Sequence, residues 1–355
     1  MENKKTKVML GMSGGVDSSA AAIKLKESGF DVVGVTMILK PAKFLSESEK
    51  LNLYKDAQDA KKVCDALSIP HLAPDFSELF EEKVIDDFIK SYLSGRTPNP
   101  CVQCNINLKF GAMLDFALKN GCDMIATGHY AVLSKGEDGR TLLKKAPTNK
   151  DQSYFLYGLN ERQLSHSVFP LWNMSKDEAR ALVASYNLPV ANKPDSQEIC
   201  FIKNNDYISF LENYGGKLPE RGNFINAEGK ILGQHTGIYR YTIGQRKGLG
   251  ITFGEPMYVK KIDAENNAVM LSRLEGLMSD TVYLRDVNLI AVDEIESELQ
   301  VEAKIRYQAK PSKAKLTKEN GVYKLTFSEK QKSVTPGQAA VFYIGDTVIG
   351  GGTII

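Results

Sequence analysis

The stretch Gly11-Met12-Ser13-Gly14-Gly15-Val16-Asp17-Ser18 decides the fold of this chain. A short apolar segment, residues 8–10, precedes it, and an alanine-rich segment, residues 19–28, follows it. This order predicts a buried strand, a tight loop and a helix. Glycines let the backbone turn sharply and approach a ligand closely, and the first turn of a helix offers free N–H groups to an anion. The stretch therefore predicts a phosphate-binding loop.

The loop differs from two common nucleotide-binding motifs. It lacks the Gly-Lys-Ser/Thr ending of a Walker loop and the Gly-x-Gly-x-x-Gly pattern of dinucleotide-binding folds. The string Ser-Gly-Gly-x-Asp-Ser instead resembles the pyrophosphate loop (PP-loop) of the N-type ATP pyrophosphatases. That resemblance implies that ATP is cleaved between its α and β phosphates and that a substrate oxygen is adenylated. A glycine turn before an ordinary capped helix is the alternative interpretation of the glycine pair alone.

Composition and charge narrow the class of protein. The 355 residues are 43% hydrophobic and 25% charged, which allows a sizeable core and two or three domains. The net charge is only +2, but residues 301–355 hold nine Lys or Arg and four Asp or Glu. Such a basic module is compatible with contact to a nucleic-acid backbone. On charge alone, a solvated lysine-rich face explains it slightly better.

Two further features indicate the compartment. The apolar run after the polar N-terminal residues is too short for a signal peptide or a membrane span, so a cytoplasmic location without membrane contact is expected. Five cysteines, an odd and small number, argue against the disulfide framework of a secreted protein. Cys64 and Cys122 fit buried apolar segments, which leaves three cysteines for chemistry or metal binding.

Those three cysteines lie in two polar motifs. Residues 96–100 predict a stiff, non-helical loop because two prolines fall within it. Cys101 and Cys104 follow, spaced as half a metal site, and a helix is expected from residue 106 to 120. A thiolate near that helix N-terminus would be stabilised by the helix dipole. Cys200, among polar neighbours, is the second reactive candidate.

Alternating strand and helix patterns predict the rest of the first half. They indicate βαβ units and a mainly parallel sheet, an α/β fold, with ligands at the carboxyl ends of the strands. Met37 ends the second predicted strand, and Gly128 and His129 follow a later one. We expect Met37 and Gly128 to contact a nucleotide and His129 to contact a phosphate or base. Apolar core and a structural histidine are the alternatives.

The pattern of the sequence changes near residue 206, from alternating strand and helix signals to recurring β and turn signals. Glycine-rich hairpins follow, and from about residue 278 short β segments recur with turn signals, which predicts a small barrel. The expected domains are therefore a catalytic domain at 1–205, a small central β-rich domain at 206–277 and a C-terminal β-barrel at 278–355.

The motifs together carry a family resemblance over the whole chain. They are Gly-Met-Ser-Gly-Gly-Val-Asp-Ser at 11–18, Thr-Pro-Asn-Pro at 97–100, Thr-Gly-His-Tyr at 127–130, Lys-Asp-Gln-Ser at 150–153, Asp-Ser-Gln-Glu-Ile-Cys-Phe at 195–201 and Thr-Pro-Gly-Gln at 335–338. This set resembles the bacterial tRNA-specific 2-thiouridylases, which thiolate the wobble uridine, position 34 of tRNA, at C2. The resemblance implies a PP-loop domain followed by a small central domain and a C-terminal β-barrel that contacts tRNA.

The resemblance also implies a reaction and its residues. The enzyme would be an ATP-dependent tRNA-uridine 2-sulfurtransferase that adenylates the C2 oxygen, after which sulfur attacks C2. By motif position Cys200 carries a persulfide and Cys104 is the nucleophile that releases the sulfur, leaving a disulfide. ATP would be bound with Mg²⁺, which Asp17 helps to hold, by Gly11, Met12, Ser13, Gly14, Gly15, Val16, Asp17, Ser18, Met37 and Gly128. The uridine must leave its stack, and the implied contacts with tRNA or the target base are Asn99, Pro100, Cys101, His129, Lys150, Asp151, Gln152, Arg306, Tyr307 and Gln338.

One position departs from the family pattern. Many members carry aspartate where this chain has Cys101, so a carboxylate role cannot be carried over. Cys101, Cys104 and Cys200 could instead hold a 4Fe–4S cluster with one open iron. We prefer the persulfide route and keep the cluster as its rival.

The resemblance also implies binding partners, and two other classes of protein are the alternatives. The expected partners are the tRNAs for Lys, Glu and Gln and a sulfur donor such as a cysteine desulfurase or a sulfur relay. Another synthetase with the same loop, of the amidotransferase or argininosuccinate synthase type, would leave the cysteine motifs without a role. A non-catalytic RNA-binding protein would leave the intact loop without one.

Overall fold

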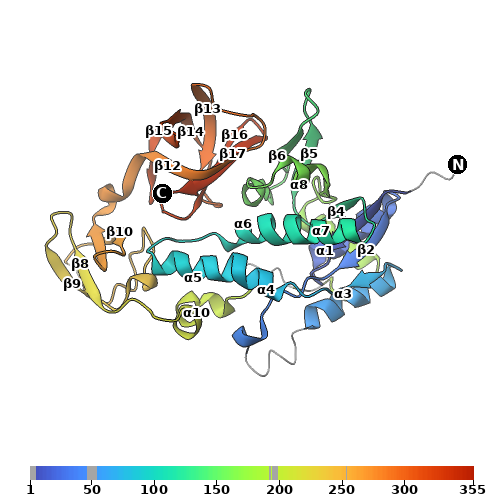
Figure 1. Ribbon diagram of the computed structural model, residues 1–355, viewed down its shortest axis with the longest axis horizontal. Helices are drawn as coiled ribbons and strands as arrows, with labels where there is room; N and C mark the ends of the chain where they lie inside the picture. The colour runs from blue at the N-terminus through green and yellow to red at the C-terminus, as the bar shows by residue number, and fades with distance from the viewer. Residues whose placement is uncertain (1–4, 46–53, 192, 194–198, 253) are drawn as a thin grey trace. The chain divides into compact units, whose positions relative to one another are not determined.

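The structure is a computed structural model that describes residues 5–45, 54–191, 193, 199–252 and 254–355 (Figure 1). The chain forms two compact units. The first takes residues 1–84, 101–197 and 346–348, and the second takes residues 85–100, 198–345 and 349–355. No helix within the described ranges has the length and apolar character needed to cross a bilayer.

A five-stranded parallel sheet is the centre of the first unit, in the order β3-β2-β1-β4-β7. Its strands are β1 Lys7–Gly11, β2 Asp31–Val35, β3 His71–Leu72, β4 Met124–Ala126 and β7 Ser167–Val168. The middle strand β1 is fully buried at Val8, Met9 and Leu10, as expected of a strand covered on both faces. The carboxyl ends of β1 and β4 share one edge because the two strands are parallel neighbours. The predicted α/β fold is confirmed.

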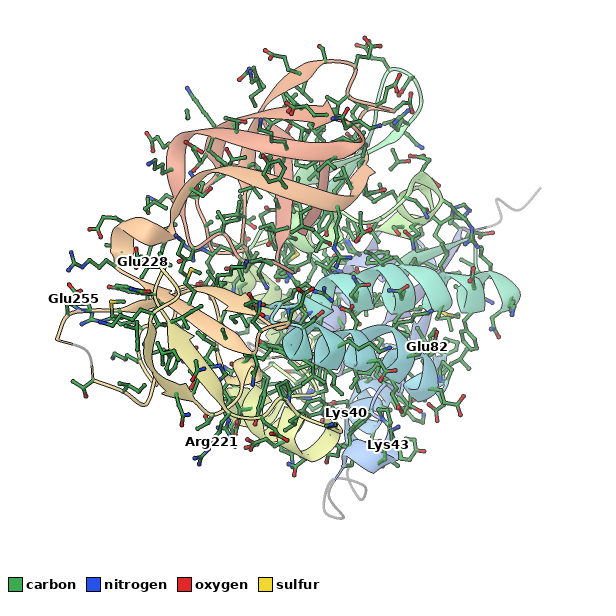
Figure 2. The ribbon with its side chains drawn as sticks, turned by 60° about the vertical axis from the view of Figure 1, so that its left-hand side comes forward. Lys40, Lys43, Glu82, Arg221, Glu228 and Glu255 are labelled. Carbon is green, nitrogen blue, oxygen red and sulfur yellow. The ribbon has the colours of Figure 1, made fainter. Side chains whose placement is uncertain are left out.

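Helices surround this sheet. They are α1 Val16–Glu27, η1 Ala42–Phe44, α3 Lys55–Ala66, α4 Ser77–Phe80, η2 Glu81–Ile85, α6 Pro100–Cys104, η3 Asn105–Ala112, α7 Met113–Lys119, η4 Ser153–Leu156, α8 Glu161–Ser165 and α9 Lys176–Ser185. In α1, Ala20, Ala21 and Ala22 are fully buried. Alanine is the best helix former and loses no side-chain entropy on burial, so this helix can pack closely on its neighbours. Lys40, Lys43 of η1 and Glu82 of η2 are exposed (Figure 2).

The helix that carries Cys101 and Cys104 begins earlier than predicted. We expected a helix only from residue 106, but α6 starts at Pro100 and runs without a break through the π-helical η3 into α7. Proline suits the first helical position, where its missing N–H would have no partner. Both cysteines therefore lie in the first turns of a helix rather than in a loop before it.

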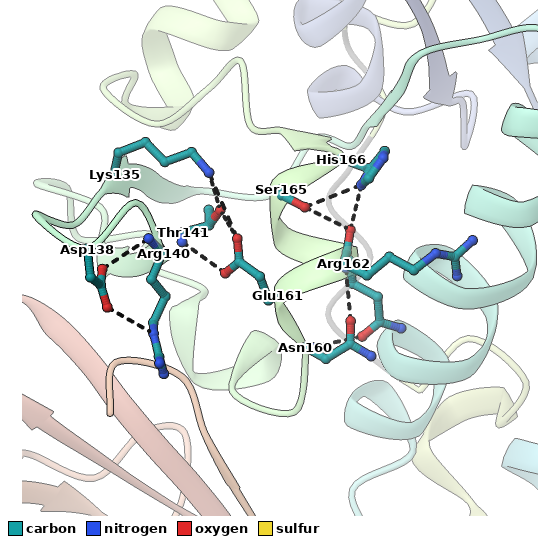
Figure 3. A network of polar contacts seen from close by, with 10 residues as sticks. Lys135, Asp138, Arg140, Thr141, Asn160, Glu161, Arg162, Ser165 and His166 are labelled. Atoms are coloured by element: carbon teal, nitrogen blue, oxygen red, sulfur yellow. Dashed lines mark hydrogen bonds and ion pairs between the residues drawn. The ribbon is translucent and has the colours of Figure 1, made fainter. Parts of the chain in front are cut away.

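One glutamate forms hydrogen bonds between a β-hairpin and a short helix. The hairpin pairs β5 Ala131–Lys135 with β6 Thr141–Lys145. Glu161, the first residue of α8, accepts hydrogen bonds from the backbone N–H of Thr141 at 2.9 Å and from its hydroxyl at 2.7 Å (Figure 3). Asn160 and Gln163 form a capping box at the start of α8. These bonds fix the segment that leads on to β7.

The second unit contains a four-stranded sheet and a barrel. The sheet has the order β10-β11-β8-β9, with β8 Gly222–Ile225, β9 Ile231–His235, β10 Tyr258–Asp263 and β11 Ala268–Ser272. The unit also holds α5 Asp86–Leu93, η5 Lys203–Asn205, α10 Tyr207–Tyr214, η6 Ile238–Arg240 and η7 Leu274–Leu277. Phe224, Val259 and Val269 are fully buried in the core of this sheet, and the charged side chains of Arg221, Glu228 and Glu255 are exposed (Figure 2).

Six antiparallel strands close the C-terminal barrel. They are β12 Met278–Leu289, β13 Glu298–Lys304, β14 Ser312–Glu319, β15 Val322–Lys332, β16 Ala339–Ile344 and β17 Thr347–Ile354. Pairing of β12 with both β15 and β17 closes the ring. Leu316, Leu325 and Phe342 fill its interior with no exposed surface. The predicted small barrel is confirmed.

Candidate active site

The loop after β1 is held in one conformation by its own hydroxyls. Ser18 Oγ accepts a hydrogen bond from the Ser13 N–H at 3.2 Å and donates to the Gly15 carbonyl at 3.1 Å. Gly14 has a φ of +66°, and a Cβ there would lie 2.9 Å from the Asp56 carbonyl oxygen. Only glycine fits this position. The exposed Ser13 and the N-terminus of α1 are thus presented at the sheet edge where the sequence predicted a phosphate site.

The other side of the loop is fixed from β2. The Met12 N–H donates to the Val35 carbonyl at 2.7 Å, and Thr36 Oγ1 donates to the Met12 carbonyl at 2.7 Å. Thr36 Oγ1 also lies 2.9 Å from His71 Nε2. Met37, one residue further on, is half-buried. A loop whose backbone is held on both sides is already shaped for a ligand.

Asp17 is engaged by two donors that sequence reasoning did not select. Its Oδ1 accepts from the Tyr130 hydroxyl at 2.7 Å and from Lys176 Nζ at 2.7 Å. Asp17 is 36% exposed at its side chain and Lys176 only 14%. The sequence shows Lys176 only within the capping box of Ser175 and Glu178, which is present at the start of α9. No local signal could have paired residues 159 positions apart.

Gly128 lets the loop after β4 approach Asp17. A Cβ at Gly128 would lie 3.0 Å from the Asp17 carbonyl carbon and 3.1 Å from its Cβ. The structure therefore brings Gly128 and the loop of residues 11–18 together, as the shared sheet edge led us to expect.

His129 is a neutral ring in an aromatic setting. Its Nδ1 lies 2.7 Å from Thr127 Oγ1, and its ring centroid is 5.8 Å from that of Phe110 and 6.2 Å from that of Phe169. Burial lowers the pKa of His129 well below 6.5, and the nearby charge of Lys109 lowers it further. A neutral imidazole suits a hydrogen bond with a base better than charge pairing with a phosphate.

Cys101 and Cys104 differ in exposure. Cys101 is exposed, whereas Cys104 is 8% exposed. Burial raises the pKa of Cys104, and the positive charge of Lys109 opposes that rise. Lys109 lies five residues after Cys104, within the π-helical η3, and the i to i+5 bonding of a π-helix brings such residues toward one face. Lys109 is therefore the group that can favour a thiolate there.

Two predicted tRNA contacts hold the fold of the first unit. Asp151 accepts hydrogen bonds from the N–H groups of Ala146 and Ser153 at 3.0 and 3.1 Å and from the Ser153 hydroxyl at 2.9 Å. Gln152 Oε1 accepts from the Tyr130 N–H at 3.1 Å. Lys150 is half-buried beside them. The polar groups of Asp151 and Gln152 thus have structural partners.

The remaining predicted residues lie in or border the second unit. Gln338 Nε2 donates to the carbonyls of Thr97 and Pro98, each at 3.1 Å. Pro100 is buried and Asn99 half-buried. Cys200 is exposed, while residues 195–198 of its motif lie outside the described residues.

Two predicted tRNA contacts lie on the barrel, in the connection between β13 and β14. Arg306 is exposed and Tyr307 is half-buried. The ammonium of Lys304 lies 5.4 Å from the centroid of the Tyr307 ring.

The donor set at the loop suits a hard cation. Among the described residues, no group of three or more His, Cys, Asp or Glu side chains is arranged to hold a metal ion. Magnesium, however, is commonly bound through one or two carboxylates together with substrate phosphates. The carboxylate of Asp17 at a phosphate-type loop fits that pattern.

Fold and site together define a nucleotide-binding α/β protein extended by β domains. Three family models match it: a tRNA methyl transferase HUP domain at residues 6–204, a tRNA methyl transferase PRC-barrel domain at 208–273 and an aminomethyltransferase beta-barrel domain at 279–354. A protein of Clostridioides difficile described as tRNA-specific 2-thiouridylase MnmA is 48% identical over 98% of both chains. One of Acetivibrio thermocellus with the same description is 46% identical over 99% of both. The chain belongs to this family of tRNA-specific 2-thiouridylases.

One solved structure shows a weaker likeness. A 4-thiouridine synthetase in complex with RNA and ATP covers 58% of this chain and 50% of its own at 17% identity, with a TM-score of 0.35. That degree of likeness does not bear on function.

Proposed function

We propose that the protein is an ATP-dependent tRNA-uridine 2-sulfurtransferase that converts the wobble uridine of tRNA to 2-thiouridine. The observation that carries the proposal is the hydroxyl-locked loop of residues 11–18, set at the carboxyl edge of a parallel sheet in the same unit as Cys101 and Cys104. Such a loop binds a polyphosphate, and the cysteines offer a route for sulfur. Membership of the thiouridylase family supports the same activity.

The first half-reaction activates a poor electrophile. The C2 carbonyl of uracil has no leaving group, so its oxygen is joined to the α phosphate of ATP and pyrophosphate departs. The N–H groups at the start of α1 and the Ser13 hydroxyl hold the phosphates. Asp17 would hold Mg²⁺ together with those phosphates, and the ion would supply neutralisation of their negative charge. Gly128 lets the loop after β4 pack directly against Asp17 at this site.

The second half-reaction exchanges oxygen for sulfur. The outer sulfur of a Cys200 persulfide bonds to C2, and the bond from C2 to oxygen breaks as AMP leaves with that oxygen. The Cys104 thiolate then attacks Cys200 Sγ, and the electron pair of the broken S–S bond passes to the outer sulfur, which stays on C2. A disulfide between Cys104 and Cys200 remains, and an external thiol reductant must reopen it.

The cluster route is the alternative. Cys101, which stands where many relatives carry aspartate, favours it because it makes a third thiol available with Cys104 and Cys200. Anaerobic purification followed by an absorption spectrum and an iron count separates the two routes. About four iron atoms per chain would favour the cluster, and an iron-free active protein would favour the persulfide.

Several finer assignments belong to the same proposal. The expected tRNAs are those for Lys, Glu and Gln, and the sulfur donor is a cysteine desulfurase or a sulfur relay. The location is cytoplasmic, and the domain division is 1–205, 206–277 and 278–355. Asn99, Pro100 and Cys101 line the target-base pocket, and Arg306 and Tyr307 contact tRNA.

The test is the dependence of ATP cleavage on tRNA. The purified protein with ATP, Mg²⁺, a persulfide donor and unmodified tRNA should produce AMP, pyrophosphate and 2-thiouridine in equal amounts. Cys104→Ser and Cys200→Ser should each abolish 2-thiouridine while leaving the Kd for tRNA nearly unchanged. Formation of ADP, or undiminished thiolation by either variant, would defeat the assignment.

A further inference from the structure

Within the second unit, a turn of the C-terminal barrel forms hydrogen bonds with the Thr97-Pro98-Asn99-Pro100 segment. The Thr97 N–H donates to the Pro336 carbonyl at 2.9 Å. The Gln338 side chain returns two hydrogen bonds to the loop, from Nε2 to the carbonyls of Thr97 and Pro98, each at 3.1 Å. Three hydrogen bonds thus join segments that are about 240 residues apart in the chain.

The sequence of the loop explains why it needs outside partners. Pro98 and Pro100 have no N–H, so the loop has few donors with which to form a turn of its own. Its carbonyls still require partners where they are shielded from water. The barrel turn provides an acceptor for the Thr97 N–H and a donor for two carbonyls.

Gly337 brings the two segments into direct contact. Its φ is +91°, and a Cβ there would lie 2.8 Å from the Thr97 carbonyl oxygen and 3.0 Å from the Thr97 nitrogen. Both the backbone conformation and the space exclude any other residue. The Gly337 N–H donates to the Ile354 carbonyl at 2.9 Å, and the Ile354 N–H donates to the Gln338 carbonyl at 2.9 Å, which ties the turn to β17.

These contacts change the expected role of Gln338. Its side-chain NH₂ group has two hydrogens, and the two loop carbonyls take them. We propose that Gly337 and Gln338 are positioning residues that hold the Thr97–Pro100 segment in the shape that receives the target base. The inference rests on the proposed function, because that function assigns Asn99 and Pro100 to the base pocket.

Gln338→Glu and Gln338→Met test the side chain. Glutamate would place a carboxylate against two carbonyls, and methionine removes the donor without adding charge. Both should slow single-turnover thiolation about tenfold, equivalent to about 1.4 kcal/mol, with the Kd for tRNA within twofold of the parent. Hydrogen exchange of the Thr97 N–H should accelerate. A weaker Kd for tRNA with a smaller salt dependence and unchanged Thr97 exchange would overturn the proposal in favour of a direct phosphate contact.

Gly337→Ala and Gly321→Ala form a matched pair. Gly321, in the turn between β14 and β15, has a φ of +81°, but a Cβ there meets nothing within 4 Å. Both variants carry similar backbone strain, but only Gly337→Ala also brings a Cβ against the Thr97 backbone. Only Gly337→Ala should therefore raise Thr97 exchange and slow thiolation, with both variants assayed below their melting temperatures. Equal effects of the two variants would refute the positioning role.

The exchange readout separates this inference from the proposed function. If the parent protein made no 2-thiouridine, the proposed function would fail, and the exchange data would still report whether Gln338 and Gly337 hold the loop. If the parent thiolates and the variants leave both exchange and rate unchanged, only the positioning role fails.

Discussion

At the scale of single residues, the site depends on a carboxylate that is already paired. Asp17 Oδ1 receives hydrogen bonds from Tyr130 and Lys176, each at 2.7 Å. Under the proposed function, a nucleotide with Mg²⁺ would bring both negative phosphates and a positive ion to Asp17. Lys176 would then pair with phosphate as the ion engages Asp17, so the charges would remain balanced.

Replacing Lys176 tests this pairing. Lys176→Met removes a positive charge next to the phosphate loop and leaves Asp17 without its cation, so a non-hydrolysable ATP analogue should bind about tenfold more weakly. Lys176→Arg should retain most of the affinity. Lys24→Met, which alters a half-buried lysine in the last turn of α1 that pairs with Glu27, is the control and should bind as the parent does. Calorimetric titration gives the Kd values, and an unchanged affinity for Lys176→Met would contradict the pairing.

His129 predicts a pH dependence of stability. Burial lowers the pKa of His129 well below 6.5 in the folded chain. Near pH 6.5 this side chain therefore binds a proton in the unfolded chain but not in the folded one. The free energy of unfolding therefore falls as the pH drops below about 6.5, by up to about 1.4 kcal/mol per pH unit until the folded pKa is reached. His129→Asn removes this contribution. In urea unfolding, the free energy of unfolding of the parent should fall by about 1 kcal/mol relative to that of the variant when the pH is lowered from about 8 to about 5.5. If the free energies of both proteins changed equally with pH, His129 would not be a neutral ring in the folded state.

At the scale of elements, the strand, loop and helix around residues 11–18 were predictable because each has a local signal. The apolar run, the glycine pair and the alanine-rich segment all appear in one short stretch. The start of α6 at Pro100 was not predicted, because two nearby prolines argue for a loop and the preference of proline for the first helical position competes with that argument. The π-helical turns of η3 have no known sequence pattern that we could apply.

Gly14→Ala tests the loop as an element. The substitution combines a φ of +66° with a contact of 2.9 Å to the Asp56 carbonyl oxygen, so the loop must move away from α3. Gly29→Ala, at a φ of +83° with open space around the added Cβ, controls for backbone strain. We expect at least about tenfold weaker ATP binding for Gly14→Ala and unchanged binding for Gly29→Ala. Equal affinities would mean that the loop shape does not decide nucleotide binding.

At the scale of the whole molecule, long-range pairing limits what sequence can predict. The α/β sheet and the barrel follow from local patterns, and the structure has both. The contacts of Lys176 with Asp17 and of Gln338 with Thr97 join residues 159 and 241 positions apart. A single sequence carries no signal for such pairs. Resemblance to the family provided the candidate residues. Only the folded structure showed that one of them, Gln338, donates hydrogen bonds to the Thr97 and Pro98 carbonyls.

The central claim is that ATP activates the C2 oxygen of a tRNA uridine. The most direct measurement is the fate of that oxygen, using tRNA that carries ¹⁸O at C2 of the wobble uridine. Mass spectrometry after thiolation should find one ¹⁸O atom in AMP and none in pyrophosphate or water. Unlabelled AMP, or label released into water while 2-thiouridine accumulates, would contradict the account.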